Sequence, residues 1–281
     1  MKIIKTVRQM QSAAQNVHRK GLRIGLVPTM GALHRAHMSL VEKARRENDV
    51  VVVSIFVNPA QFGPNEDYLR YPRPFKNDAA ACRKAGCDII YNPAVKEMYG
   101  TDYLTYVKVE KLSDLLCGKS RPVHFRGVTT VVTKLFNAVL PDRAYFGLKD
   151  YQQLKIIQKM ARDLDVPVKI IPCPIVREPD GLAMSSRNVY LTEKQRAEAP
   201  KIYQALKSVR KLIRTRKLKT IKDSAEHIRK AVSSIPDSRI DYIKFCHPET
   251  LKDAKGSTNQ PLRLLAAVYV GKARLIDNIR I

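Results

Sequence analysis

The fold is decided by one stretch, Pro28-Thr-Met-Gly-Ala-Leu-His-Arg-Ala-His-Met-Ser-Leu40. The apolar run 23–27 before it predicts a short buried strand, and residues 39–46 at its end predict a helix. A strand, a turn that contains glycine and a helix start therefore meet within a few residues. Such a junction exposes backbone N–H groups and carries a partial positive charge. It predicts a binding site for an anion such as phosphate.

The composition is that of an ordinary globular chain with an unusual surplus of positive charge. Of 281 residues, 44% are hydrophobic and 27% are charged, and 51 Lys and Arg against 26 Asp and Glu give a net charge of +25. This charge fits a nucleic-acid-binding protein, an enzyme with anionic substrates, or a basic surface in contact with solvent. The basic residues gather between 201 and 230 on a helical apolar pattern, which predicts a solvated helix face. Nucleic-acid binding is therefore the less favoured interpretation.

No segment of the sequence predicts membrane insertion or export. The longest apolar run, 50–57, is far shorter than the roughly 20 residues that span a bilayer. Residues 1–19 carry Lys, Arg and Gln where a secretory signal would be apolar, so we expect a cytoplasmic protein. The cysteines form no C-x-x-C pair, which predicts free thiols and neither a disulfide framework nor a thiolate zinc site; they are Cys82, Cys87, Cys117, Cys173 and Cys246.

Strand and helix patterns alternate over the first part of the chain. The run 50–57 is almost continuously apolar, which is typical of a strand covered on both faces of a parallel sheet. Further strands are expected at 88–91, 144–146 and 168–171, and helices at 1–20, 39–46, 74–85, 127–140 and 151–164. This alternation predicts an α/β fold with a Rossmann-like, doubly wound parallel sheet. The polar loop 58–67 follows a strand at its carboxyl end, where such sheets bind ligands.

The pattern changes near residue 176. Helical segments and two strand-like runs without a crossover helix follow, at 193–214, 221–233, 240–245 and 262–270. We therefore expect two domains, 1–176 with the parallel sheet and 177–281 as a smaller α+β C-terminal domain.

His34 and His37 are the first candidate site residues. They lie three positions apart at a helix start, so both side chains fall on one side of the first turn and can face an anion. A zinc site would need a third protein ligand, and the spacing suggests none. A buried structural histidine is the alternative for either residue alone, whereas the pair after a glycine turn favours phosphate binding.

Two further groups of residues can contact a nucleotide. In Gly147-Leu-Lys-Asp150, Lys149 can reach a phosphate, and Asp150 can accept hydrogen bonds from ribose hydroxyls or cap the next helix. In Met184-Ser-Ser-Arg187, two hydroxyls and a guanidinium can hold phosphate oxygens and stabilise a leaving pyrophosphate. The serines can instead serve a turn and a helix cap, and that alternative stays open.

Longer motifs extend from these candidate residues along positions 20–190. They are the opening stretch, Ser54-Ile-Phe-Val-Asn-Pro-Ala-Gln-Phe-Gly63, Tyr71-Pro-Arg73, Arg121-Pro-Val-His-Phe125, residues 131–137, Lys149-Asp-Tyr-Gln-Gln-Leu154 and Pro174-Ile-Val-Arg-Glu-Pro-Asp-Gly-Leu-Ala-Met-Ser-Ser-Arg-Asn188. In this order they resemble the motifs of the pantothenate synthetase family, and the C-terminal part is more loosely similar.

The resemblance implies an ATP-dependent ligase of the nucleotidylyltransferase superfamily. Pantoate's carboxylate would attack the α-phosphorus of ATP and release pyrophosphate, and β-alanine's amine would then attack the pantoyl adenylate to give pantothenate, a coenzyme A precursor, and AMP. A carboxylate needs such activation, and the mixed anhydride must be kept from water. The resemblance also implies a homodimer without a membrane partner, and Mg²⁺ on the ATP phosphates with no metal site built from protein alone.

The resemblance also implies roles for individual residues of this chain. Catalytic roles fall to His34, His37, Lys149 and Arg187, with His37 as a donor to the phosphates. ATP would bind to Met30, Gly31, Ala32, Leu33, His34, Arg35, Ala36, His37, Gly147, Leu148, Lys149, Asp150, Val176, Met184, Ser185, Ser186 and Arg187. Gln61 and Gln153 would bind pantoate, Gln61 would also lie near β-alanine, and the neighbours of the carboxylate and phosphates would be Arg121 and Tyr71. Residues 177–281 would act as a lid.

Three positions depart from the family pattern. Ala36 replaces the glycine of the usual His-x-Gly-His, which lets the nucleotide lie close to the helix start, and Val123 replaces the glycine of Arg-Pro-Gly-His-Phe. Leu148 replaces a glutamate, from which we expect little effect. Two alternatives to an active ligase therefore stay open: a basic nucleic-acid-binding protein on the same fold, and a family member that binds ligands with impaired turnover.

Overall fold

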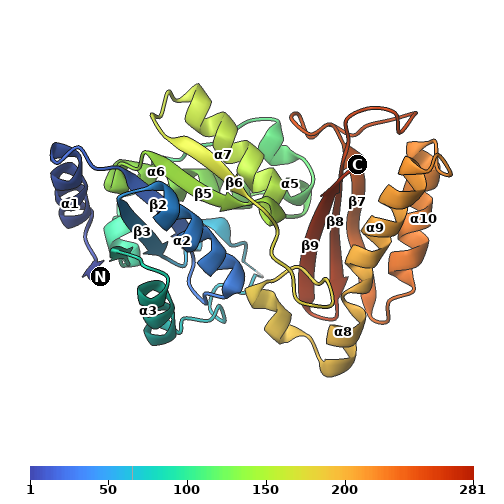
Figure 1. Ribbon diagram of the computed structural model, residues 1–281, viewed down its shortest axis with the longest axis horizontal. Helices are drawn as coiled ribbons and strands as arrows, with labels where there is room; N and C mark the ends of the chain where they lie inside the picture. The colour runs from blue at the N-terminus through green and yellow to red at the C-terminus, as the bar shows by residue number, and fades with distance from the viewer. Residues whose placement is uncertain (65) are drawn as a thin grey trace. The chain divides into compact units, whose positions relative to one another are not determined.

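The computed structural model describes residues 1–64 and 66–281, which divide into two compact units (Figure 1). Asn65, within the predicted loop 58–67, lies outside the described residues. Unit 1 consists of residues 1–114, 121–148 and 153–174, and unit 2 consists of residues 115–120, 149–152 and 175–281. The division into domains 1–176 and 177–281 stays a prediction, since unit 2 also takes in two short earlier segments. Within the described residues, no helix combines the length and apolar character needed to cross a membrane.

Unit 1 contains a six-stranded sheet in the order β1-β4-β3-β2-β5-β6, and its described strand pairs are parallel. The strands are β1 Lys2–Ile4, β2 Ile24–Thr29, β3 Val50–Ile55, β4 Ile89–Tyr91, β5 Arg143–Gly147 and β6 Lys169–Cys173. The α-helices between them are α1 Val7–Arg19, α2 Arg35–Glu47, α3 Phe75–Lys84, α4 Val95–Met98, α6 His124–Val139 and α7 Tyr151–Asp163. Short 3₁₀ helices are η1 Pro59–Gln61, η2 Leu112–Asp114 and η3 Leu148–Asp150; residues 149–152, which span the end of η3 and the start of α7, belong to unit 2. The predicted parallel α/β sheet is confirmed.

Side chains on both faces of β2 and β3 are buried. Val27 and Val53, which are neighbours in register, pack in one core cluster with residues of α2 and α3. Leu26 and Val52 alternate with them and are also fully buried. Because successive strand residues point to opposite faces, burial on both sides explains the continuous apolar run. The five cysteines are free, as predicted, and all are buried; this cluster includes Cys82, Cys87 and Cys173.

The first residues differ from the single helix that the sequence predicts over 1–20. Lys2–Ile4 form β1, which pairs with β4, and α1 begins only at Val7. The Thr6 hydroxyl caps α1 by accepting the Gln9 N–H at 3.3 Å. A three-residue strand with two exposed residues is too short to show an alternating pattern.

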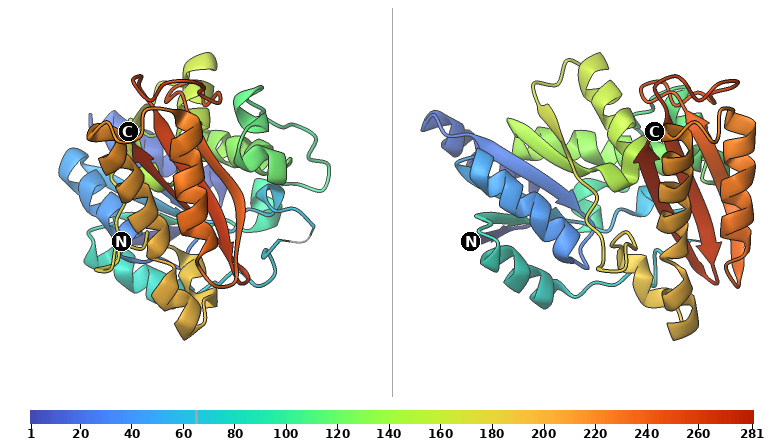
Figure 2. Two further views of the ribbon diagram at one scale, coloured as in Figure 1. Left: turned by 90° about the vertical axis from the view of Figure 1, so that its right-hand side faces the viewer. Right: turned by 45° about the vertical axis from the view of Figure 1, so that its right-hand side comes forward.

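Unit 2 contains an antiparallel three-stranded sheet in the order β7-β8-β9, and Figure 2 shows helices α9 and α10 lying along one of its faces. Its elements are α5 Cys117–Ser120, η4 Ser186–Tyr190, α8 Glu193–Glu198, α9 Lys201–Arg214, α10 Ile221–Ser233, β7 Ser238–Cys246, β8 Arg263–Val270 and β9 Ala273–Arg280. The smaller α+β part is confirmed. The sequence patterns predict β7 and β8 but miss β9, because Asp277 and Asn278 interrupt its apolar alternation. Pro200 divides the helical segment 193–214 into α8 and α9.

Candidate functional site

The turn between β2 and α2 places His34 and His37 side by side. Helix α2 begins at Arg35, four residues earlier than the sequence indicates, so His34 is its N-cap and His37 lies in its first turn. The two ring centroids are 4.1 Å apart, and the His34 backbone N–H donates to His37 Nδ1 at 3.3 Å. Because Nδ1 accepts this bond, the proton of the neutral His37 ring lies on Nε2. His37 therefore carries a side-chain N–H donor at the N-terminus of a 13-residue helix.

Asp78 holds this turn in place, although the sequence motifs do not single it out. Its side chain comes from α3, and the residue is 2% exposed. Its two carboxylate oxygens accept the backbone N–H groups of Leu33 at 2.7 Å and Ala32 at 3.0 Å. Burial raises the pKa of the Asp78 carboxyl, and these two donors act in the opposite direction. In the sequence, the one indication that Asp78 is buried is its spacing: it lies four residues before Cys82 and therefore on the same, inward side of α3.

The backbone of the turn requires such support. Gly31 has φ +86° and Ala32 has φ +51°, both in the left-handed region. For a residue with a Cβ atom this region costs roughly 1–2 kcal/mol. A Cβ at Gly31 would also lie 3.0 Å from Asp78 Oδ2. Glycine at position 31 therefore allows both the turn and the approach of the carboxylate.

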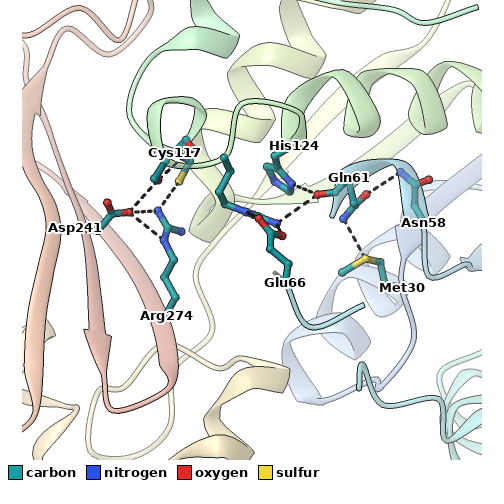
Figure 3. A network of polar contacts seen from close by, with 10 residues as sticks. Met30, Asn58, Gln61, Glu66, Cys117, His124, Asp241 and Arg274 are labelled. Atoms are coloured by element: carbon teal, nitrogen blue, oxygen red, sulfur yellow. Dashed lines mark hydrogen bonds and ion pairs between the residues drawn. The ribbon is translucent and has the colours of Figure 1, made fainter. Parts of the chain in front are cut away.

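Gln61 lies in a buried polar network at the end of η1 (Figure 3). Its Oε1 accepts from Asn58 Nδ2 at 3.1 Å, and its Nε2 donates to Met30 Sδ at 3.0 Å. Its backbone carbonyl lies 3.0 Å from His124 Nδ1 and accepts from Arg121 at 3.4 Å. The network fixes the Gln61 side chain beside the opening turn, and Asn58 and His124 are members that the predicted site did not include.

Helix α6 approaches η1 so closely that only glycine fits at position 127. A Cβ there would lie 2.1 Å from the Ala60 carbonyl oxygen. The Gly127 carbonyl accepts from Asn58 Nδ2 at 3.0 Å, which connects the helix to the Gln61 network. The position of Gln61 therefore depends on this helix contact.

Arg121, which the resemblance places near a substrate carboxylate, is paired with a carboxylate of the protein. Its Nε donates to Glu66 Oε1 at 2.8 Å, and a second nitrogen pairs with Glu66 Oε2. Tyr71 is buried and packs edge-on against Phe62, with ring centroids 6.1 Å apart. Contacts of Arg121 and Tyr71 with substrate stay predictions.

In unit 2, Lys149 lies among charged groups. Lys149, Ser185 and Asp277 line one cavity. Burial lowers the pKa of Lys149; the carboxylates of Asp150 and Asp277 raise it, and the Arg187 guanidinium lowers it further. The two cations expected at the phosphates, Lys149 and Arg187, thus belong to one electrostatic group.

A hairpin carries the Met184-Ser-Ser-Arg187 segment. Its two arms are joined where Glu178 N–H donates to the Leu182 carbonyl at 2.8 Å and Met184 N–H donates to the Val176 carbonyl at 3.1 Å. Helix η4 follows, and the Ser185 hydroxyl accepts from the Arg187 N–H at 3.3 Å. Ser185 therefore caps η4, which is the alternative that the sequence left open.

The predicted site residues are divided between the two units. Unit 1 holds the segment 30–37 with Gln61, Tyr71, Arg121, Gly147, Leu148 and Gln153, whereas unit 2 holds Lys149, Asp150, Val176 and the segment 184–187. The binding of one ligand by both sets stays a prediction.

The two glycine replacements occupy ordinary backbone conformations. Val123 has φ −90° and ψ −13° at the start of α6, and the residue is 37% exposed. Ala36 lies within helix α2. Neither position needs the conformational freedom of glycine, so the replacements leave the backbone of both segments intact.

Comparisons with known proteins agree over the whole chain. A family model described as pantoate-beta-alanine ligase matches residues 2–280. The pantothenate synthetases of Thermotoga petrophila and Moorella thermoacetica are 52% and 50% identical to this chain; each match covers 99% of this chain, and 99% and 98% of the relatives, respectively. A crystal structure of pantothenate synthetase from Thermus thermophilus has a TM-score of 0.92 at 45% identity and covers 99% of each chain. The pantoate-beta-alanine ligase from Francisella tularensis, solved in complex with beta-gamma ATP and beta-alanine, has a TM-score of 0.81 at 37% identity and covers 100% of this chain and 97% of its own.

Proposed function

Because the chain belongs to the pantoate-beta-alanine ligase family, we propose that it condenses pantoate with β-alanine at the expense of ATP. Pantoate's carboxylate attacks the α-phosphorus and pyrophosphate leaves; the amine of β-alanine then displaces AMP from pantoyl adenylate and yields pantothenate. The observation that carries the proposal is the family match over residues 2–280. The complex of the Francisella relative with beta-gamma ATP and beta-alanine supports two of the ligands.

We assign His37 the role of a neutral hydrogen-bond donor to the ATP phosphates. The His34 N–H donates to Nδ1 of His37, so this nitrogen is an acceptor and the ring is not an imidazolium while that bond persists. Its Nε2–H and the N-terminus of α2 favour negative charge at the same place. Phosphoryl transfer depends mainly on positioning and charge stabilisation, which these groups supply without a general base.

We assign Lys149 and Arg187 to the triphosphate. A protonated Lys149 acts as a point charge on phosphate oxygens, while the Arg187 guanidinium can contact two oxygens at once. Since burial lowers the pKa of Lys149, the carboxylates of Asp150 and Asp277 help to keep it protonated. Ser185 and Ser186 would contribute hydroxyl or backbone donors beside them.

We propose that Mg²⁺ enters with the nucleotide. Among residues 1–64 and 66–281, no group of three or more His, Cys, Asp or Glu side chains is arranged to hold a metal ion. Because Mg²⁺ in nucleotide sites binds mainly through phosphate oxygens, the ATP phosphates would supply the main ligands, and the ion would neutralise their charge.

We propose that Gln61 and Gln153 bind pantoate, with β-alanine near Gln61. The Nε2 of Gln61 donates to the sulfur of Met30, which is a weak acceptor. A pantoate oxygen is a better acceptor, so substrate can take over this donor while Asn58 keeps the amide oriented. On the family resemblance we also propose that the protein is a cytoplasmic homodimer.

Pyrophosphate release tests the proposal. With ATP and pantoate alone we expect a burst close to one equivalent of enzyme, because the adenylate stays bound, and with β-alanine we expect continuous turnover. No pantoate-dependent pyrophosphate at saturating ATP would contradict the ligase reaction. ATP binding with no burst would instead favour a ligand-binding member with impaired turnover.

The net charge of +25 favours one other function, binding of nucleic acid through phosphates. It predicts association with duplex DNA or RNA that persists at physiological salt and weakens steeply as salt increases. Fluorescence anisotropy of a labelled duplex over a salt series measures this. If binding is already lost at salt concentrations below the physiological one, the protein is not a nucleic-acid-binding protein and its positive charge is a property of the surface alone.

A further inference from the structure

We propose that Asp277 and Asn278, neighbours in β9, are positioning residues that hold the two phosphate-binding segments of unit 2 ready for ATP. The inference rests on the proposed function, because that function assigns Lys149 and the segment 184–187 to the triphosphate. Neither residue belongs to a predicted motif, yet Asp277 is 6% exposed and Asn278 is 3% exposed. Buried polar side chains need hydrogen-bond partners, and the partners of these two lead to the phosphate-binding segments.

The two side chains leave β9 on opposite faces. Successive residues of a strand point to alternate sides, so Asp277 shares a face with Leu275 and Ile279. These two belong to the core cluster formed with α9 and α10. Asn278 therefore points to the other face. The two consecutive residues therefore make contacts on opposite faces of the sheet.

On the first face, Asp277 holds the hairpin that leads to residues 184–187. Its Oδ2 and Oδ1 accept from the two terminal nitrogens of Arg177 at 2.7 and 2.8 Å. The same guanidinium donates to the Gly181 carbonyl at 3.0 Å and lies 3.4 Å from the ring centre of Tyr203. Arg177 therefore connects the first arm of the hairpin, its tip, α9 and β9. A bidentate arginine pair fixes direction as well as distance.

On the second face, Asn278 holds the backbone of Lys149. Its Nδ2 donates to the Lys149 carbonyl at 3.0 Å. Its Oδ1 accepts from Arg263 at 2.9 Å and 2.5 Å, which determines which end of the amide faces Lys149. Arg263 also lies 4.2 Å from the ring centre of Tyr151, two residues after Lys149. The segment that carries the lysine is thereby attached to the sheet at two points.

These contacts set the two phosphate-binding segments at a fixed separation before ATP arrives. Consecutive Cα atoms are about 3.8 Å apart, so the anchors cannot move independently. Preorganised donors lower the cost of binding a charged transition state, since the protein does not have to reorder them. Asp277 has a second effect, because its carboxylate raises the pKa of Lys149. Asp150 raises it as well, and Arg187 lowers it.

The test compares Asp277→Asn and Asn278→Asp with the control Asp241→Asn. Asp241 Oδ2 accepts from two nitrogens of Arg274 at 3.0 and 2.6 Å, and both side chains of this pair are at most 16% exposed, so it is a second largely buried aspartate–arginine pair of unit 2. Each variant keeps the shape of the side chain. For each full-length protein we measure melting temperature, the KM for ATP and for β-alanine, and the pH profile of pantoate-dependent pyrophosphate release.

For Asp277→Asn we expect the KM for ATP to rise about 10- to 100-fold with little change in the KM for β-alanine. The alkaline loss of activity should also move to lower pH, because Lys149 loses a carboxylate that favours its protonated form. Asn278→Asp places an acceptor against the Lys149 carbonyl and should raise the KM for ATP similarly. Asp241→Asn should lower the melting temperature and leave both KM values and the pH profile unchanged.

The proposal is overturned if the wild type is active and Asp277→Asn has the same KM for ATP and the same pH profile as the wild type. It is also overturned if Asp241→Asn changes the KM for ATP as much as Asp277→Asn does. Should Asp277→Asn fail to fold, Asn278→Asp decides: a selective rise in the KM for ATP supports the proposal and an unchanged value overturns it. An inactive wild type would instead contradict the proposed function itself.

Discussion

Two buried aspartates hold candidate phosphate-binding segments, and they do so by different means. Asp78 in unit 1 accepts backbone N–H groups of the turn directly, whereas Asp277 in unit 2 acts through Arg177. The difference follows from what each segment leaves unpaired. The turn has left-handed residues and two N–H groups without a partner in regular structure, while the hairpin arms pair with each other.

The comparison teaches that a carboxylate can order a loop with or without a cation, at different electrostatic cost. Two backbone donors do not fully offset the burial of Asp78, so its pKa is raised. At Asp277 a full positive charge faces the carboxylate in bidentate geometry. The turn in unit 1 should therefore be sensitive to pH through Asp78, and the hairpin should be sensitive to loss of either charge of its ion pair.

The largest effect is expected at His37, the candidate hydrogen-bond donor to phosphate that follows the turn held by Asp78. His37→Ala should slow adenylation by about two to three powers of ten while the fold persists, as expected for loss of a charge-stabilising donor. Single-turnover pyrophosphate release measures it, with His227→Ala on the exposed side of α10 as control. An unchanged adenylation rate in His37→Ala would show that the histidine is not the donor.

Asp78→Ala removes the carboxylate that holds the turn in unit 1. Two buried N–H groups lose their acceptor, at about 1–3 kcal/mol each, so the free energy of unfolding should fall by about 2–6 kcal/mol. Asp78→Asn should lose less, because its amide oxygen still accepts one of them. Urea denaturation gives these values. The control is Asp163→Ala, which removes an exposed ion pair with Lys159 and should cost at most about 1 kcal/mol. A loss of stability in Asp78→Ala no larger than this would show that Asp78 does not hold the turn in place.

The pH dependence of stability sharpens the same comparison. Because the folded pKa of Asp78 is raised, the folded protein binds a proton there before the unfolded chain does. The contribution of this carboxyl to stability therefore increases as pH falls through its folded pKa. When unfolding is measured from pH 7 down to pH 4, the free energy of unfolding of the wild type should increase relative to that of Asp78→Asn. A constant difference between them over this range would mean that burial does not perturb Asp78.

The smallest expected effect concerns the helix start at Ala36. Its backbone is helical, so Ala36→Gly should cost about 0.5–1 kcal/mol of stability and change the KM for ATP by less than about threefold. Thermal unfolding and steady-state kinetics measure both. Val123→Gly, at a right-handed position, provides the parallel case. A fall of tenfold or more in the KM for ATP would instead identify the Ala36 methyl group as an obstacle to the nucleotide.

Much of the architecture can be predicted from residues that are close in the sequence. The apolar run in 50–57 predicted a strand covered on both faces, and residues 23–46 predicted a strand, turn and helix in that order; both predictions are confirmed. The motifs between residues 20 and 190 identified the family, which the comparisons confirm. Local periodicity and motif spacing suffice for these because the information lies within a few turns of chain.

Only the tertiary structure decided which residues hold the candidate site together. Asp78 reaches a turn 45 residues away, Asp277 pairs with an arginine 100 residues away, and Asn278 contacts a carbonyl 129 residues away. The short edge strand β1 and the polar-interrupted β9 escaped the sequence patterns for a related reason, since pairing with distant strands defines them. An aspartate or asparagine in a sequence does not specify its partner, because one side chain can accept from many donors and only the folded chain brings a particular one within reach.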